Sequence, residues 1–317
     1  MFKKSFSIFK ISTRILLLLW LMISCDYGPK PNKVIEITLE LDETVNTDQE
    51  LNSIVQKLQK RLKKIAVNSE FLSIPEKNQI KITVTTFYQT ERFNRYLVNP
   101  GKLDFYETYK NEEMFSFLAK VYEQVKNKDS VAHPFQDLIK ESGYPGGPIL
   151  FSVEEKDTAT VNRYFSMKGV ESALPAKKRY VKFLWGIKEK GTGYFPLYVL
   201  KKNRLGKPAL SGDVVTDAFM NYDSFERPVI SMQMNEEGAA IWEDLTGKAF
   251  QERSNIAIVL NDQVYSAPGV SAGPIHAGRS EISGDFTVEE AQDFANILMS
   301  GSIPKMSIVE VKVKEIK

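Results

Sequence analysis

The side chains that carry most enzymatic chemistry are scarce in this chain of 317 residues. It has two histidines, His133 and His276, and one cysteine, Cys25. A zinc site or a nucleophile activated by a base needs several such groups brought together, and these three lie far apart in the sequence. Both histidines stand in loop-like stretches, which predicts surface or loop positions. We therefore expect no metal site, no cofactor and no catalytic residues, so the protein is not expected to be an enzyme.

Other residue patterns that bind ligands have simpler interpretations. Thr246-Gly247-Lys248 lacks the upstream glycine of a phosphate-binding loop. Acidic pairs such as Glu236-Glu237 and Glu289-Glu290 stand at expected helix starts, where they complement the helix dipole. The aromatic residues mostly alternate with polar ones, which predicts core positions. A minority could instead line a groove for an extended apolar peptide, and the sequence does not separate the two.

Cys25 ends a short apolar run near the start of the chain. The run, Ile15–Ile23, has nine residues, fewer than the roughly 20 that a membrane-spanning helix needs. Basic residues and no acids precede it: Lys3, Lys4, Lys10 and Arg14. A basic start followed by a short apolar core is typical of a secretory signal.

The residues Leu21–Ser24 resemble the bacterial lipoprotein box, in which the following cysteine receives a lipid before cleavage. We therefore predict a lipoprotein signal peptide over 1–24, lipidation with fatty acyl chains at Cys25, and a tether over 25–33. The alternative is a plain signal peptide with an incidental cysteine. Removal of the signal leaves 38 basic against 40 acidic residues, which argues against a nucleic-acid-binding surface.

The first part of the mature chain predicts a ferredoxin-like order of elements. Residues 34–41 alternate apolar and polar side chains, as a half-buried strand does. Thr47 and Glu50 form a capping box before a helix, whose apolar face is Leu51, Ile54, Val55, Leu58, Leu62 and Ile65. Two strands with a turn at 76–78, a short helix at 91–98 and a strand at 102–109 complete a βαββαβ order.

The signals from 111 to 204 are weaker and predict helices at 114–125 and 158–167 and strands at 181–186 and 194–200. The last third is clearer. It predicts a strand at 228–234, a helix capped by Asn235, and a hairpin that turns at Asn261-Asp262. Thr287 and Glu290 then form a second capping box, with a helix that closes at Gly301. A strand at 307–316 follows.

Four stretches from Gly212 onward resemble, in order, the first periplasmic domain of SecD, the Sec translocase subunit that is often fused as SecDF. They are LSGDVVTDAFMNYD, RPVISMQMNEEGAAIWEDLT, IAIVLNDQVYSAPGV and EISGDFTVEEAQDFANILMSGSIPKMSIVE. The earlier stretch NPGKLDFYETYKNEEMF resembles the family as well, so the resemblance covers about Val34 to Val311. One departure is the hairpin turn, where Asp262 stands in the place of a usual glycine and must accept a positive φ.

The resemblance implies an α+β fold with a ferredoxin-like βαββαβ base subdomain and an inserted α+β head subdomain. The base is expected over 34–109, the head over 110–285, and a helix and strand over 286–317 that return to the base. Chain crossings near Lys110 and Gly284 would form a hinge between the lobes.

The resemblance also implies a role in Sec-dependent protein export, by binding unfolded preprotein or the Sec translocon. Because the family's membrane helices are missing from this sequence, we expect no proton-coupled motor activity. We expect a lipid anchor in a bacterial membrane, with the protein facing the periplasm. Asp26 beside the cysteine favours the inner membrane. The alternative is a peptide- or protein-binding lipoprotein unrelated to Sec.

Overall fold

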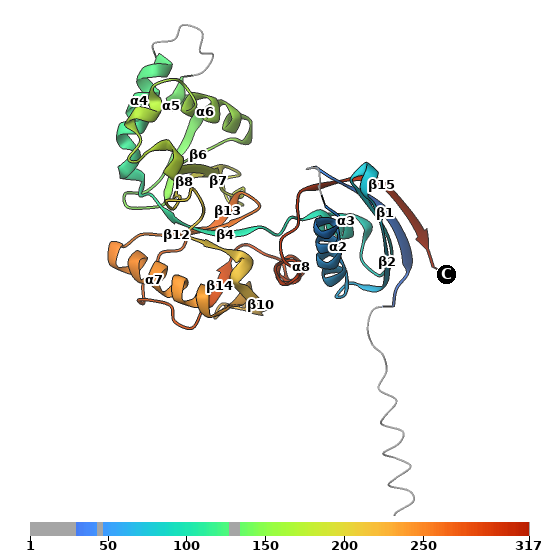
Figure 1. Cartoon of the computed structure of the whole chain (residues 1–317). Coiled ribbons are helices and arrows are strands. Elements are labelled where there is room, and N and C mark those ends of the chain that lie inside the picture. Colours follow the sequence, from blue (N-terminus) through green and yellow to red (C-terminus); the bar gives the residue numbers. More distant parts are fainter. Residues whose placement is uncertain (1–29, 43–46, 127–133, 317) are drawn as a thin grey trace, which may run out of the picture.

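A four-stranded antiparallel sheet forms the smaller of two lobes, which we call the base (Figure 1). The computed structural model describes residues 30–42, 47–126 and 134–316. The base strands run in the order β15-β1-β3-β2, and two helices cover one face of the sheet. The elements of the base are β1 (Lys33–Leu41), α2 (Asp48–Leu62), β2 (Ala66–Ile74), β3 (Gln79–Thr86), α3 (Thr90–Val98) and β15 (Met306–Glu315).

Strand alternation and helix capping account for the elements of the base. Ile35, Ile37 and Leu39 alternate along β1 with zero exposed fraction, and they face the helices. Thr47 begins α2, because its hydroxyl accepts a hydrogen bond from the N–H of Glu50 at 3.2 Å. The base therefore has the α+β, ferredoxin-like architecture that the sequence predicts.

One strand of the base differs from the prediction. The sequence places the strand at 102–109 in the base, within a domain at 34–109. The structure pairs this strand, β4 (Leu103–Thr108), with the head strands β12 and β8. The last strand of the ferredoxin-like order is instead β15, which pairs with β1. The physical reason is that all but one of the six β4 side chains are buried, which suits the middle of a larger sheet.

The larger lobe, which we call the head, contains two sheets (Figure 1). The large sheet runs in the order β13-β12-β4-β8-β6-β5, with β7 also paired to β8 and β9 to β4. Its strands are β5 (Ile139–Ser142), β6 (Ile149–Val153), β7 (Val181–Trp185), β8 (Phe195–Lys201), β9 (Leu210–Ser211), β12 (Ile256–Leu260) and β13 (Gln263–Ser266), with β4. The small sheet runs in the order β10-β11-β14, formed by Val215–Tyr222, Pro228–Met234 and Arg279–Ser283.

Helices cover the head sheets on two sides. The helices α4 (Phe115–Lys126), α5 (Phe135–Leu138) and α6 (Thr158–Phe165) pack with β6 and β8 around a core that includes Phe117 and Phe151. The helices α7 (Glu236–Glu252) and α8 (Val288–Ser300) share a second core with the small sheet. None of the helices in the described ranges has the length and apolarity that crossing a membrane requires.

Helix α8 belongs to both lobes. Ala291, Ala295 and Leu298 pack into the head core, whereas Ile297 packs into the base core. Figure 1 shows α8 between the two lobes, beside α2. The sequence assigns 286–317 to the base as a unit. The structure corrects this, because only the strand joins the base sheet and the helix is shared.

Candidate interlobe site

The chain crosses between the lobes twice, at residues 99–102 and 301–305. Gly101 and Gly301 have φ values of 68° and 80°, in the region that glycine adopts without strain. The two crossing segments are hydrogen-bonded to each other, because the N–H of Ile303 donates to the carbonyl of Pro100 at 2.9 Å. The lobes are therefore joined by a paired connection.

The buried Arg61 of α2 binds both crossing segments. Its side chain is fully buried, and its guanidinium donates to the carbonyls of Leu97 (3.1 Å) and Asn99 and to the hydroxyl of Ser300 (3.1 Å). Longer hydrogen bonds of 3.4 Å reach the carbonyls of Tyr96 and Gly301. Burial lowers the pKa of Arg61 to about 10. The C-terminal carbonyls of α3 and α8, the negative ends of two helix dipoles, thus converge on one cation.

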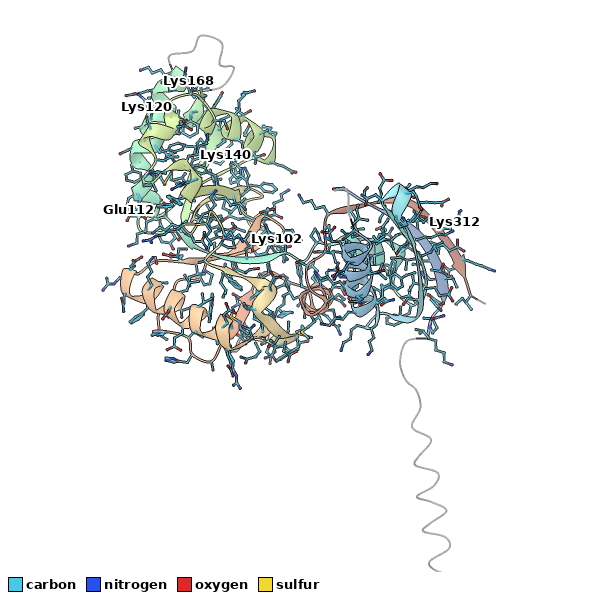
Figure 2. The ribbon with its side chains drawn as sticks, in the orientation of Figure 1. Lys102, Glu112, Lys120, Lys140, Lys168 and Lys312 are labelled. Carbon is cyan, nitrogen blue, oxygen red and sulfur yellow. The ribbon has the colours of Figure 1, made fainter. Side chains whose placement is uncertain are left out.

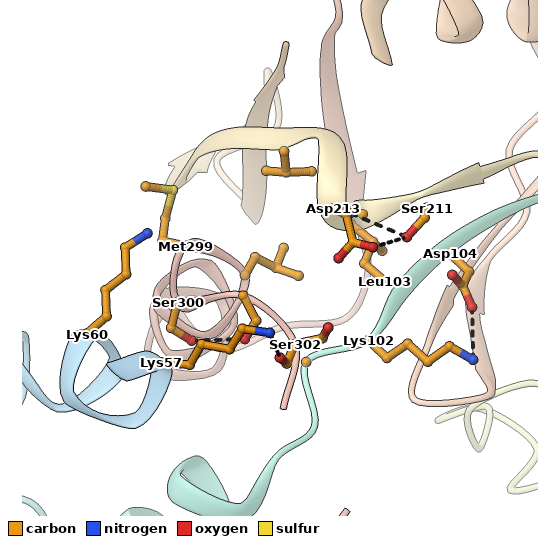
Figure 3. A pocket seen from close by; sticks show the side chains of 15 residues that line it. Lys57, Lys60, Lys102, Leu103, Asp104, Ser211, Asp213, Met299, Ser300 and Ser302 are labelled. Atoms are coloured by element: carbon orange, nitrogen blue, oxygen red, sulfur yellow. Dashed lines mark hydrogen bonds and ion pairs between the residues drawn. The ribbon is translucent and has the colours of Figure 1, made fainter. Parts of the chain in front are cut away.

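A polar cleft of about 350 Å³ lies beside this junction (Figure 3). Lys57 and Lys60 project from α2 of the base. Asp213 and Ser211 line the cleft from the head, where the Ser211 hydroxyl donates to the Asp213 carboxylate at 3.1 Å. The ammonium of Lys57 donates to the carbonyl of Ser302 at 2.7 Å, which ties the base to the second crossing segment. The cleft is lined mainly by hydrogen-bonding groups, so it suits a polar chain or an ion-pairing partner.

A network of charges continues from the cleft across the head. Lys102, at the first crossing, lies 3.3 Å from the carboxylate of Asp104 and 3.7 Å from that of Asp262. Lys182 of β7 donates to the Asp262 carboxylate at 2.6 Å. Burial raises the pKa of Asp104, and Lys102 opposes that shift. The hydrogen bond from Lys182 lowers the pKa of Asp262. Figure 2 shows Lys102 at the edge of the head next to the base.

A second cleft of about 440 Å³ lies on the α3 side of α8. It is lined by Tyr265 and Phe294, whose rings pack edge to face with centroids 5.4 Å apart. The guanidinium of Arg92 in α3 donates two hydrogen bonds, of 2.7 and 2.9 Å, to the carboxylate of Asp293 in α8. This cleft therefore combines an aromatic wall with an ion pair that holds α8 to the base.

The residues that the sequence assigns to a hinge lie elsewhere. Lys110 follows β4 inside the head, where its N–H donates to the carboxylate of Glu113 at 2.7 Å. Gly284 follows β14, also inside the head. The crossings are at 99–102 and 301–305 because β4 belongs to the head and α8 is shared, so neither residue lies between the lobes. Cys25, His133 and the signal lie outside the described residues.

His276 is exposed, with Nδ1 3.0 Å from the carboxylate of Glu243. In the described ranges, no three His, Cys, Asp or Glu side chains gather as possible metal ligands.

The sequence analysis missed the residues that join the lobes. Arg61 could have been found from the sequence, because it continues the buried series Ile54 and Leu58 on α2. A cation at an apolar position of a helix signals a buried, fully bonded role.

The two lobes have the architecture that the resemblance to SecD implies, and sequence comparison supports the resemblance. Residues 188–305 match the family model described as "SecDF, P1 head subdomain". Protein translocase subunit SecD of Rhodothermus marinus is 41% identical over 160 residues, half of this chain and 25% of the relative. SecD of Calditerrivibrio nitroreducens is 28% identical over 277 residues, 86% of this chain and 42% of the relative. The chain thus spans less than half the length of these relatives.

Solved structures share the fold of the chain. A crystal structure of SecDF in a super-membrane-facing form superposes with a TM-score of 0.55 at 19% identity, covering 96% of this chain and 34% of SecDF. A structure described as "a membrane component SecDF that enhances protein export" gives a TM-score of 0.51 at 20% identity, covering 87% of this chain and 99% of that one. In sequence and fold, this chain is similar to part of SecD and SecDF, with both a base and a head lobe.

Proposed function

We propose that this protein acts in Sec-dependent protein export, as a SecD-like module at the periplasmic side of a bacterial membrane that binds an exported preprotein or the translocon. The observation that carries the proposal is the SecD likeness of the chain, which extends over 86% of it in one relative and includes the whole P1 head match. The two clefts beside α8 support binding at the junction of the lobes.

The proposed role is binding, without catalysis and without proton-coupled motor activity of its own. The interlobe cleft supports a binding role, because Lys60 and Asp213 line it and make no ion pair among the described residues. Lys60 is exposed, so it is available to a carboxylate or carbonyl of a client.

Membrane attachment is proposed through a lipid on Cys25. Its support is the sequence pattern of four basic residues, an apolar run and a cysteine. Each buried methylene of an acyl chain contributes about 0.8 kcal/mol to membrane binding, so several chains on one cysteine hold a protein firmly. Intact mass measurement of the mature protein should show a chain beginning at Cys25 with added lipid. An unmodified N-terminus would rule the anchor out.

Crosslinking in cells tests the export role. A tagged full-length chain, crosslinked while an exported protein is arrested in transit, should recover Sec subunits or the arrested chain. Lys60→Glu should lower this recovery if the interlobe cleft contacts the client. Lys64→Glu, an exposed residue just beyond the end of α2, is the matched control because it makes the same charge change away from the cleft. Recovery of neither Sec subunits nor the exported chain would reject the proposal and favour a lipoprotein unrelated to Sec.

A further inference from the structure

Strand β10 is an open edge of the small head sheet. It pairs with β11 on one side, and in the described part of the chain no strand pairs with its other side. Its eight residues, Val215–Tyr222, include a single charged residue, Asp217. Long edge strands in soluble proteins are normally protected by lysines, prolines or covering elements, because their free backbone groups otherwise attract another strand.

The hydrogen-bond register shows which backbone groups of β10 are free. In the hairpin turn, the N–H of Asp223 donates to the carbonyl of Arg227 at 3.0 Å. Pairs alternate between bonded and non-bonded along an antiparallel ladder, so Phe219 and Asn221 bond to β11. The N–H and C=O groups of the alternate residues Ala218, Met220 and Tyr222 therefore point away from β11. Ala218 is only 7% exposed and packs in the same core as α8, so the accessible free groups are those of Met220 and Tyr222.

Aromatic side chains flank this open edge. Phe219 and Tyr222 are each 51% exposed, and they lie on opposite faces of β10 because they are three residues apart in a strand. Phe225 in the adjoining turn is 76% exposed. The carboxylates of Asp217 and Glu226 are exposed near the two ends of the strand and make no ion pair within the described ranges. The edge thus combines free backbone groups, apolar rings and unpaired negative charge.

The other open edges of the described sheets are mostly protected. The edge strand β15 carries Glu310, Lys312 and Lys314, and the short edges β14 and β5 also carry charged residues. The base edge β2 is the nearest equivalent, with Val67 and Leu72 exposed but no exposed aromatic ring. The first residue of β10, Val215, lines the interlobe cleft, so the open edge is continuous with the site described above. Figure 1 places β10 next to α8.

We propose that β10 binds an extended segment of unfolded polypeptide by strand addition, with apolar residues alternating along the segment and basic residues between them. The added strand would take the free N–H and C=O groups of Met220 and Tyr222 and pack between the rings of Phe219 and Tyr222. Asp217 and Glu226 select a basic over an acidic segment. This inference rests on the proposed function, which names an unfolded exported chain as one of the clients.

Residue-level hydrogen exchange on the full chain tests strand addition directly. The probe is a short synthetic peptide in which valine alternates with lysine, and its binding is followed in parallel by fluorescence anisotropy. Bound peptide should slow amide exchange at Met220 and Tyr222. The amides of Phe219 and Asn221, already bonded to β11, should change little. A matched peptide with glutamate in place of lysine should bind at least tenfold more weakly.

Variants separate the β10 edge from other apolar surface. The double variant Phe219→Ser with Tyr222→Ser should weaken peptide binding at least tenfold. The control, Val67→Ser with Leu72→Ser on the β2 edge, should leave binding unchanged. Peptide that binds without protecting the amides of Met220 and Tyr222 overturns strand addition but leaves the export proposal intact. If neither this peptide nor an arrested exported chain binds at all, strand addition fails together with the preprotein part of the proposed function.

Discussion

At the scale of single residues, Arg61 has the strongest structural role. It is a fully buried cation whose partners are backbone carbonyls and one hydroxyl rather than a carboxylate. Removing one side of a buried charged network leaves the other side unsatisfied, which is more costly than never having built it. The carbonyls of Leu97 and Asn99 lie at the C-terminal end of α3, where the chain leaves the base, so Arg61 fixes the direction of the first crossing segment.

Arg61→Met should therefore lower the free energy of unfolding by about 3 kcal/mol or more, because several buried carbonyls lose their donor. The free energy of unfolding of Arg61→Lys should lie between those of the parent protein and Arg61→Met, since an ammonium cannot reach groups on both α3 and α8. Urea denaturation measures both. Arg95→Met, an exposed change on α3, should shift stability by less than about 0.5 kcal/mol. A loss below about 1 kcal/mol for Arg61→Met would show that the junction does not depend on this side chain.

At the scale of elements, the β12–β13 hairpin joins the head to the crossing segment. Asn261 and Asp262 have φ values of 52° and 62°, as the predicted tight turn requires. The structure adds that the Asn261 side chain accepts from the N–H of Lys102 at 3.0 Å and donates to the side chain of Asn99 at 2.9 Å. The turn is thus a support for the lobe junction as well as a connection.

These contacts predict different costs for two glycine substitutions in the turn. Asn261→Gly keeps the positive φ but loses two hydrogen bonds, so it should destabilise the protein by about 1 to 2 kcal/mol. Asp262→Gly relieves the strained φ while it loses partly exposed ion pairs, so its net effect should stay within about 0.5 kcal/mol. Thermal unfolding measures both. Equal losses from the two changes would mean that Asn261 acts only through its backbone.

The elements themselves could mostly be predicted from local sequence, whereas their partners could not. Strand alternation, the capping box at Thr287 and the turn at Asn261 are confirmed, since each depends on neighbouring residues. The placement of β4 was wrong because a local strand pattern does not show the partners of the strand, and long-range pairing with Ile256–Leu260 places it in the head sheet. The binding role of β10 had no local signal, because an open edge is a property of the assembled sheet.

At the scale of the whole molecule, both lobes depend on groups that are buried without charge. Burial raises the pKa of Tyr88, in the base, to about 12. It raises the pKa of Tyr106 and of Tyr198, in the head, to the same value. The ordinary value is about 10. The shared helix α8 connects these regions, because Tyr88 donates to the carboxylate of Asp293 at 3.1 Å.

These shifts predict that stability falls in alkaline solution. A protonated tyrosine is favoured in the folded state, so its contribution is complete below about pH 10 and is lost as the pH rises through about 12. Arg61 acts in the opposite sense, because its lowered pKa reduces the cost of its burial above about pH 10. Its single contribution to stability is outweighed by those of the several buried tyrosines. Urea unfolding should therefore show lower stability at about pH 11 than at about pH 8. The double variant Tyr106→Phe with Tyr198→Phe should lose less over that interval. If it loses as much as the parent chain, ionisation of these two buried hydroxyls is not what weakens the head.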